Sequence, residues 1–140
     1  KWENAAGYNV FGFGSLGVGT STDPNVLDDN NQVSFGSLDS GTIAVTIVWG
    51  NFGGPTFNRK LVAWDQVFNT NYLWSEDATG DAARMDFENI STHELGHSIG
   101  LADIYNASCS NVTMYGYGTE GETKKRSLEP ADILGAGTLY

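Results

Sequence analysis

The sequence predicts a domain of the α+β class, in which a sheet packs on helices that follow it along the chain. Two continuous runs rich in β-branched and apolar residues, at 42–49 and 61–68, favour strands. Helical segments are expected after them, at about 86–98 and 130–139. Strands that precede helices, rather than alternating with them, are typical of α+β architecture.

Composition limits the class of protein and its partners. The chain has 140 residues, with 17 acidic against 7 basic residues and a formal net charge of −10. That length suits one domain with one modest core, and we expect a sheet part over 1–85 and a helical part over 86–140. Nucleic acid binding requires a basic face, so nucleic acid is excluded as an expected partner.

Three further observations concern membrane spans, secretion and disulfide bonds. No apolar run reaches the roughly 18 residues of a membrane span, so none is expected. The acidic, glycine- and asparagine-rich, lysine-poor composition favours a secreted protein. Cys109 is the only cysteine, so no disulfide forms within this chain.

The N-terminal part supplies the expected sheet. Residues 1–6 are compatible with a short helix, and 8–13 alternate as a strand does. The glycine-rich stretch at 12–19 indicates a flexible loop, because no strand leads into a helix with the spacing of a nucleotide-binding loop. The acidic loop at 28–31 is either an ordinary polar turn or a calcium loop. Residues 33–35 begin extended structure.

Two strong strands and their connections follow. The run at 42–49 is continuous and apolar, which predicts a strand buried on both faces. A loop containing glycine and proline spans 51–58, and 61–68 forms the second strand. Residues 74–81 are polar and predict a loop.

The next helix carries the candidate chemistry. Asp86 caps a helix that begins at Phe87, and the helix ends near Ser98 before Gly100. On a helix, residues i and i+4 share a face, so His93 and His97 both reach one metal ion.

A complete zinc site needs more than two histidines. Glu94 projects beside them, where it can act on a metal-bound water, and H-E-x-x-H on a helix carries this chemistry. Gly100 lets the chain reverse, which brings Asp103 back as a third ligand. A catalytic zinc takes three protein ligands and keeps one position for water.

The run 93–103 resembles the metzincin zinc endopeptidases, whose pattern is H-E-x-x-H-x-x-G-x-x-H or D. Residues 110–115, with Met114, resemble the methionine-containing turn of these enzymes. The tail 126–140 looks like the last helix of a matrixin-type catalytic domain of the small prokaryotic kind. Aspartate at 103, where most matrixins have histidine, is the pattern of the snapalysin branch. The resemblance is dense from Asp86 onward and looser before it.

This resemblance implies a fold and an activity. The fold is a mixed, twisted sheet packed on an active-site helix and a C-terminal helix. The activity is zinc-dependent hydrolysis of peptide bonds in a protein or peptide substrate, by a metal-activated water with Glu94 as general base and then general acid. His93, His97 and Asp103 are the implied zinc ligands.

Further roles follow from the same resemblance. Met114 packs under the two histidines, and Tyr115 and Tyr117 are candidates for contact with the substrate. The substrate pairs as an added strand with 61–68 or with the segment just after it. Core strand is the alternative for 61–68, and the two roles are compatible.

The N-terminus leaves two alternatives open. Residues 2–7 look like the closing part of the family's first long helix, which implies that a first strand and most of that helix lie upstream. They would then belong to a separate N-terminal segment or propeptide. The alternative is that the protein is simply shorter.

Two other functions stay open beside the endopeptidase. One is a non-catalytic, zinc-stabilised binding module, and the other is a metal hydrolase with a different substrate. A structural zinc normally has four protein ligands, and the sequence offers three and keeps Glu94, which favours the enzyme. The basic run 124–126 indicates a solvated loop or a site of self-cleavage.

Overall fold

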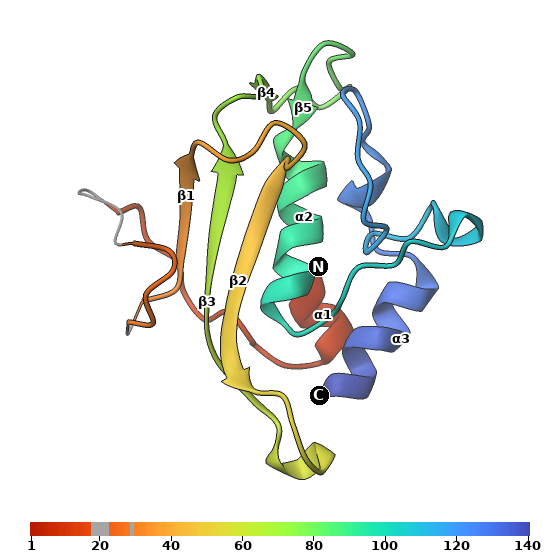
Figure 1. Cartoon of the computed structure of the whole chain (residues 1–140). Helices are drawn as coiled ribbons and strands as arrows, with labels where there is room; N and C mark the ends of the chain where they lie inside the picture. Colours follow the sequence, from red (N-terminus) through yellow and green to blue (C-terminus); the bar gives the residue numbers. More distant parts are fainter. Residues whose placement is uncertain (18–22, 29) are drawn as a thin grey trace.

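The computed structural model describes residues 1–17, 23–28 and 30–140, and it has the predicted α+β class (Figure 1). Its elements, in chain order, are α1 (Trp2–Ala6), β1 (Gln32–Gly36), β2 (Ala44–Asn51), η1 (Thr56–Asn58), β3 (Lys60–Asn69), β4 (Trp74–Ser75), β5 (Met85–Asp86), α2 (Phe87–Ser98), η2 (Ala107–Cys109), η3 (Lys124–Arg126) and α3 (Pro130–Leu139). None of the helices in the described part of the chain has the length and apolar character needed to cross a membrane.

The main sheet is mixed and has the strand order β1-β3-β2. β1 runs parallel to β3, and β2 runs antiparallel to it. α2 packs against β2 and β3, and α3 lies on the far side of α2 from the sheet (Figure 1). The second half of β3 is fully buried, so β3 is the central strand.

The prediction that 42–49 is a strand buried on both faces is wrong. The strand exists as β2, but within the described chain it pairs only with β3 and forms an edge of the sheet. Its residues Ala44 to Trp49 are half-buried. A continuous apolar run predicts a strand but does not say how many neighbours the strand has, because pairing depends on distant residues.

The predicted strand at 8–13 is also wrong. Gly7, at φ +68°, ends α1, and the segment after it hydrogen-bonds to side chains instead of to a strand. Glu3 Oε1 accepts the Phe11 N–H at 3.2 Å, and Asn9 Oδ1 accepts the Gly12 N–H at 2.8 Å. Such local bonds compete with a sheet ladder for the backbone.

Other loop predictions have mixed outcomes. Residues 12–17 have no regular structure, as expected for the glycine-rich loop, and 18–22 lie outside the described residues. Asp29 of the acidic loop also lies outside them. The expected loop at 74–81 begins with the two-residue strand β4, which pairs in parallel with β5.

Two clusters form the core. Aromatic rings of Phe35, Phe68, Trp74 and Phe87 pack between the sheet and the start of α2. At the other end, the buried side chains of Trp2, Ile99, Met114 and Ala136 join α1, the end of α2, the turn at 110–115 and α3. The helix that carries the histidines is therefore fixed at both ends.

Candidate metal centre

The N-terminus of α2 is fixed by its cap. Asp86 accepts the N–H of Asn89 at 2.7 Å, as predicted for an N-cap residue. The same carboxylate forms a buried ion pair with Arg126, whose Nε lies 2.9 Å from Asp86 Oδ1. Hydrogen bonds from Arg126 and Asn89 outweigh the effect of burial and keep the pKa of Asp86 below its ordinary value.

The C-terminus of α2 turns the chain back toward the histidines. Gly100 has φ +99°, a conformation that favours glycine. Its N–H donates to His97 O at 2.8 Å, and the Leu101 N–H donates to Gly96 O at 3.0 Å. These bonds close the helix in the manner of a glycine C-cap, and the chain then returns with Asp103.

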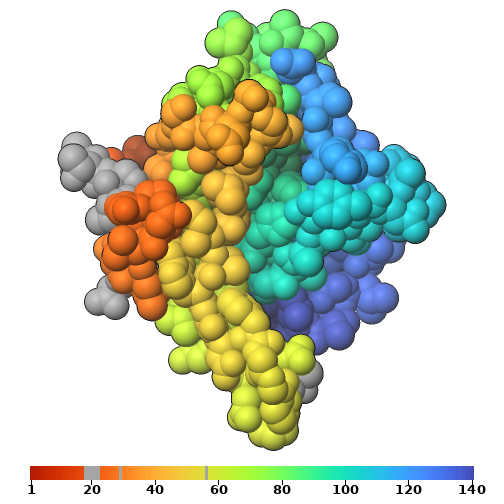
Figure 2. Space-filling view, viewed as in Figure 1, coloured from red at the N-terminus to blue at the C-terminus, as the bar shows by residue number. Residues whose placement is uncertain are grey.

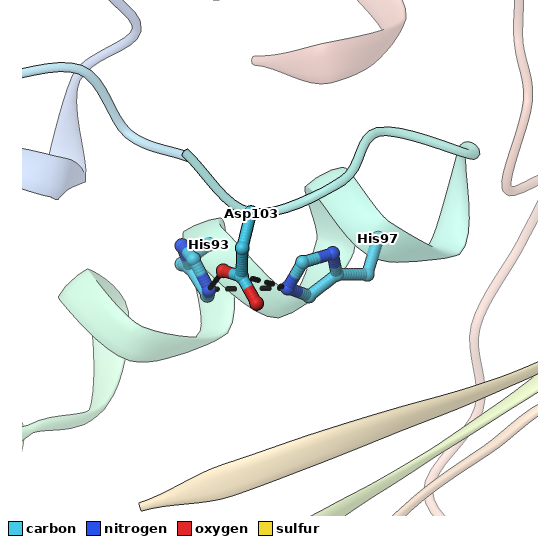
Figure 3. Close-up of side chains that lie close together, drawn as sticks. All are labelled: His93, His97 and Asp103. Atoms are coloured by element: carbon cyan, nitrogen blue, oxygen red, sulfur yellow. Dashed lines mark hydrogen bonds and ion pairs between the residues drawn. The ribbon is translucent and has the colours of Figure 1, made fainter. Parts of the chain in front are cut away.

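The structure brings His93, His97 and Asp103 together (Figure 3). The two Nε2 atoms lie 3.1 Å apart. Asp103 Oδ1 lies 3.2 Å from His93 Nε2 and 3.5 Å from His97 Nε2. All three ligand atoms fall within 4.8 Å of one another, which is the spacing of ligands around a single ion.

The hydrogen bonds around the imidazoles assign their tautomers. His93 Nδ1 donates to Thr113 O at 2.7 Å, and His97 Nδ1 donates to Leu101 O at 2.8 Å. Both Nε2 atoms therefore carry lone pairs, and backbone carbonyls fix the rings as they do for metal-binding histidines.

The third ligand fits the same interpretation. Asp103 Oδ1 is buried and has no hydrogen-bond partner in the part of the chain that the structure describes. Three lone pairs that converge without a donor between them match the donor set of a zinc ion.

The side chain of Met114 lies directly beneath the helix. A Cβ built on Gly96 would meet Met114 Sδ at 2.2 Å, so the absence of a side chain at Gly96 lets the methionine pack there. Met114 is buried, and its N–H is held by Asp132. Met114 therefore packs against α2 at Gly96, one residue before His97.

A cleft of about 660 Å³ runs past these residues. β2 borders one side of it, and the segments at 102–105 and 116–118 border the other, as Figure 2 shows between the yellow strand and the cyan segment. His93, Glu94 and His97 line it. Glu94 is 5% exposed and lies in the same cleft as the candidate ligands, as the motif predicts.

The two candidate pocket tyrosines differ in position. Tyr117 lines the cleft, whereas Tyr115 is not among its lining residues. The ring of Tyr115 instead packs against Tyr117 and beneath the ammonium of Lys124.

Sequence reasoning missed two polar partners of the site. Tyr105 Oη donates to Asp103 Oδ2 at 3.0 Å, and Thr46 Oγ1 donates to Glu94 Oε2 at 2.6 Å. Tyr105 stands two residues after the third ligand, which is a signal that the sequence offers. The sequence offers no such signal for Thr46, because this residue lies in an apolar strand far from the motif.

Of the two alternatives for 124–126, a solvated loop or a site of self-cleavage, the solvated loop is wrong for Lys125. Lys125 is 1% exposed, and its Nζ donates to Tyr115 O at 2.6 Å and Tyr117 O at 2.7 Å. Burial lowers its pKa. A basic run predicts a solvated surface, but here the backbone carbonyls of Tyr115 and Tyr117 accept hydrogen bonds from the buried ammonium of Lys125.

The helix α2 and the three converging side chains of His93, His97 and Asp103 define a candidate metal site. A comparison with known protein families matches residues 26–140 to the family described as Matrixin. The chain belongs to the matrixin family, which consists of zinc-dependent peptidases. It is therefore a peptidase domain. No curated protein matches the chain.

Proposed function

We propose that the protein is a zinc endopeptidase in which His93, His97 and Asp103 hold the metal and Glu94 transfers protons. The observation that carries the proposal is the convergence of two imidazole Nε2 atoms on a buried carboxylate oxygen that has no donor of its own among the described residues. A zinc ion at this position supplies a Lewis acid that acidifies water and polarises the peptide carbonyl.

Glu94 is the candidate proton carrier. Glu94 lines the same cleft as His93 and His97, where its carboxylate would accept a proton from the attacking water and return it to the leaving amine. No covalent intermediate is required in this scheme. Cys109, which lies outside the cleft lining, has no part in it.

β2 is the candidate edge for substrate alignment, in place of 61–68 or the segment just after it, which were expected from the sequence. β3 is the central strand and has a neighbour on each side, whereas β2 pairs only with β3 within the described residues. β2 also borders the cleft along 44–46 and at Val48. An extended peptide can add to such an edge by main-chain hydrogen bonds.

Cleavage of unfolded protein by matched variants tests the proposal. Glu94→Gln should keep full zinc occupancy and lose about 10²–10⁴-fold in kcat/KM on a casein-type or peptide-library substrate. Glu88→Gln removes another carboxylate of the same helix, whose side chain is 55% exposed, and should cleave like the wild type.

The outcomes separate the alternatives. A zinc-loaded wild type that cleaves no protein or peptide would favour a non-catalytic binding module or a hydrolase with another substrate. Equal cleavage by the wild type and Glu94→Gln would remove Glu94 from the chemistry and leave the peptidase family assignment in place.

We also propose a calcium ion at the loop 28–31. Asp65, on the neighbouring β3, supports it: its Oδ2 is buried and without a hydrogen-bond partner in the described chain, and burial raises its pKa. Calcium should raise the Tm of the wild type and leave that of Asp65→Asn nearly unchanged. An equal shift in both proteins would reject the site.

We further propose that the enzyme acts outside the cell, which secretion from its native host would test.

A further inference from the structure

The carboxylate of Glu94 is held from the sheet by a residue of β2. Thr46 Oγ1 lies 2.6 Å from Glu94 Oε2, across 48 positions in the sequence. An O–H···O⁻ bond of about 2.5–2.7 Å has the length of a charge-assisted hydrogen bond, which is among the stronger kinds in proteins. The two side chains meet inside the cleft, since both line it.

The backbone of Glu94 is anchored to the same part of the sheet. Thr46 pairs with Gln66 across β2 and β3, and Gln66 Nε2 donates to Ser98 Oγ at 2.9 Å. Ser98 Oγ in turn donates to Glu94 O at 3.3 Å. The glutamate is therefore fixed at its main chain by the helix and Ser98, and at its carboxylate by Thr46.

The hydroxyl of Thr46 has two acceptors within reach but only one proton. Glu94 O lies at 3.2 Å from Oγ1 and Glu94 Oε2 at 2.6 Å, so the carboxylate is the better acceptor by both distance and charge. The bond occupies Oε2 and leaves Oε1 for another partner.

We infer that Thr46 is a positioning residue for Glu94: its hydroxyl holds one carboxylate oxygen so that the other faces the metal side of the cleft. This inference rests on the proposed function, in which Glu94 transfers protons. A glutamate side chain has three rotatable bonds and loses considerable freedom when it is fixed. Thr46 fixes it before substrate arrives, which is how a proton carrier gains from preorganisation.

Three variants separate the hydroxyl from the shape of the side chain. Thr46→Val keeps the shape and removes the donor, and Thr46→Ser keeps the donor and removes a methyl group. Thr92→Val is the control: it removes a hydroxyl of α2 that is more buried than that of Thr46, donates to Glu88 O at 2.7 Å and does not line the cleft.

We expect Thr46→Val to lower kcat and to leave KM nearly unchanged. In zinc-loaded protein, Thr46→Val should lower kcat by about tenfold or more with KM within about twofold of the wild type, because the lost bond involves a charged acceptor. Thr46→Ser should restore most of the lost kcat, and Thr92→Val should turn over like the wild type. Crystal structures should show Glu94 in one rotamer in the wild type and in several in Thr46→Val.

Two results would overturn the inference. One is an unchanged kcat in Thr46→Val, and the other is a Thr46→Ser variant no faster than Thr46→Val. The Glu94→Gln variant, measured in parallel, separates this failure from that of the proposed function. If Glu94→Gln is inactive while Thr46→Val is normal, only the role of Thr46 fails. If Glu94→Gln is fully active, both fail.

Discussion

Asp132 and His93 are joined through one backbone residue. Asp132 Oδ2 accepts the Thr113 N–H at 2.8 Å, and the Thr113 carbonyl accepts the Nδ1 proton of His93 at 2.7 Å. Asp132 Oδ1 also accepts the Met114 N–H at 3.2 Å. The first turn of α3 thus holds the peptide that orients a candidate zinc ligand, so the last helix of the chain belongs to the metal site.

Asp132→Asn should weaken both the fold and the metal site. An amide group presents one acceptor oxygen where the carboxylate presents two, so a buried N–H loses its partner at a cost of about 1–3 kcal/mol. Zinc affinity should fall by about tenfold, because His93 loses its orienting support. Urea unfolding and competition with a zinc indicator measure the two effects. Asp81→Asn, at an exposed ion pair with Arg84, is the control, and wild-type zinc affinity in Asp132→Asn would contradict the prediction.

Tyr105→Phe should lower zinc affinity without changing the fold. Its hydroxyl donates to Asp103 Oδ2 and so helps aim Oδ1 at the imidazoles. Loss of such an outer hydrogen bond typically costs about 10–100-fold in metal affinity. Tyr117→Phe removes the neighbouring hydroxyl and should bind zinc like the wild type. The same competition assay decides, and equal affinities in both variants would show that Tyr105 does not orient Asp103.

Asp86 should contribute a measurable share of the acid sensitivity of the fold. The pKa of Asp86 is lowered in the folded protein, so its contribution to stability is present above the unfolded pKa of about 3.9 and is lost as pH falls through the folded value. At pH 7, Asp86→Asn should destabilise by about 3 kcal/mol, because it leaves Arg126 without its buried partner.

The difference in Tm between the wild type and Asp86→Asn should therefore shrink as pH falls from 7 to 3. Thermal unfolding over that range measures it. A difference that stays constant with pH would show that the carboxylate charge of Asp86 does not stabilise the start of α2.

Two glycine-to-alanine changes should have opposite signs. In α2, a Cβ at Gly96 would meet Met114 Sδ at 2.2 Å and Trp2 Cζ2 at 2.9 Å, so Gly96→Ala should destabilise by about 1–3 kcal/mol. In α3, a Cβ at Gly137 would meet only Ala5 O, at 3.6 Å, so Gly137→Ala should stabilise by about 0.5–1 kcal/mol. Chemical denaturation of the two variants tests the pair, and a stabilised Gly96→Ala would rule out the tight packing of Met114.

Much of the helix that carries the site could be predicted because its signals are local. The cap at Asp86, the histidine spacing of one turn and the glycine that ends the helix each depend on residues within a few positions. The same holds for α3, which begins at Pro130 as expected. The return of Asp103 to the histidines followed from the reversal at Gly100.

Most of the errors concern partners that lie far apart in the sequence. The edge position of β2 depends on pairing with β3, and the burial of Lys125 depends on the carbonyls of Tyr115 and Tyr117, which no pattern within 124–126 reveals. Thr46 is similar, because its acceptor is 48 positions away. The segment at 8–13 is an exception, because its partners are local. It alternates like a strand, but the side chains of Glu3 and Asn9 accept two of its backbone N–H groups.

The edge position of β2 among the described residues has a consequence for which molecules the proposed endopeptidase would cleave. A peptide that pairs with this edge must be extended over several residues. A helix or a tightly folded domain therefore cannot pair with β2 unless it unfolds locally. On the proposed alignment, an extended conformation of the substrate would be selected before any particular amino-acid sequence. On the proposed function, unfolded and partly degraded proteins would be consumed first, and intact copies of the enzyme itself would survive beside them.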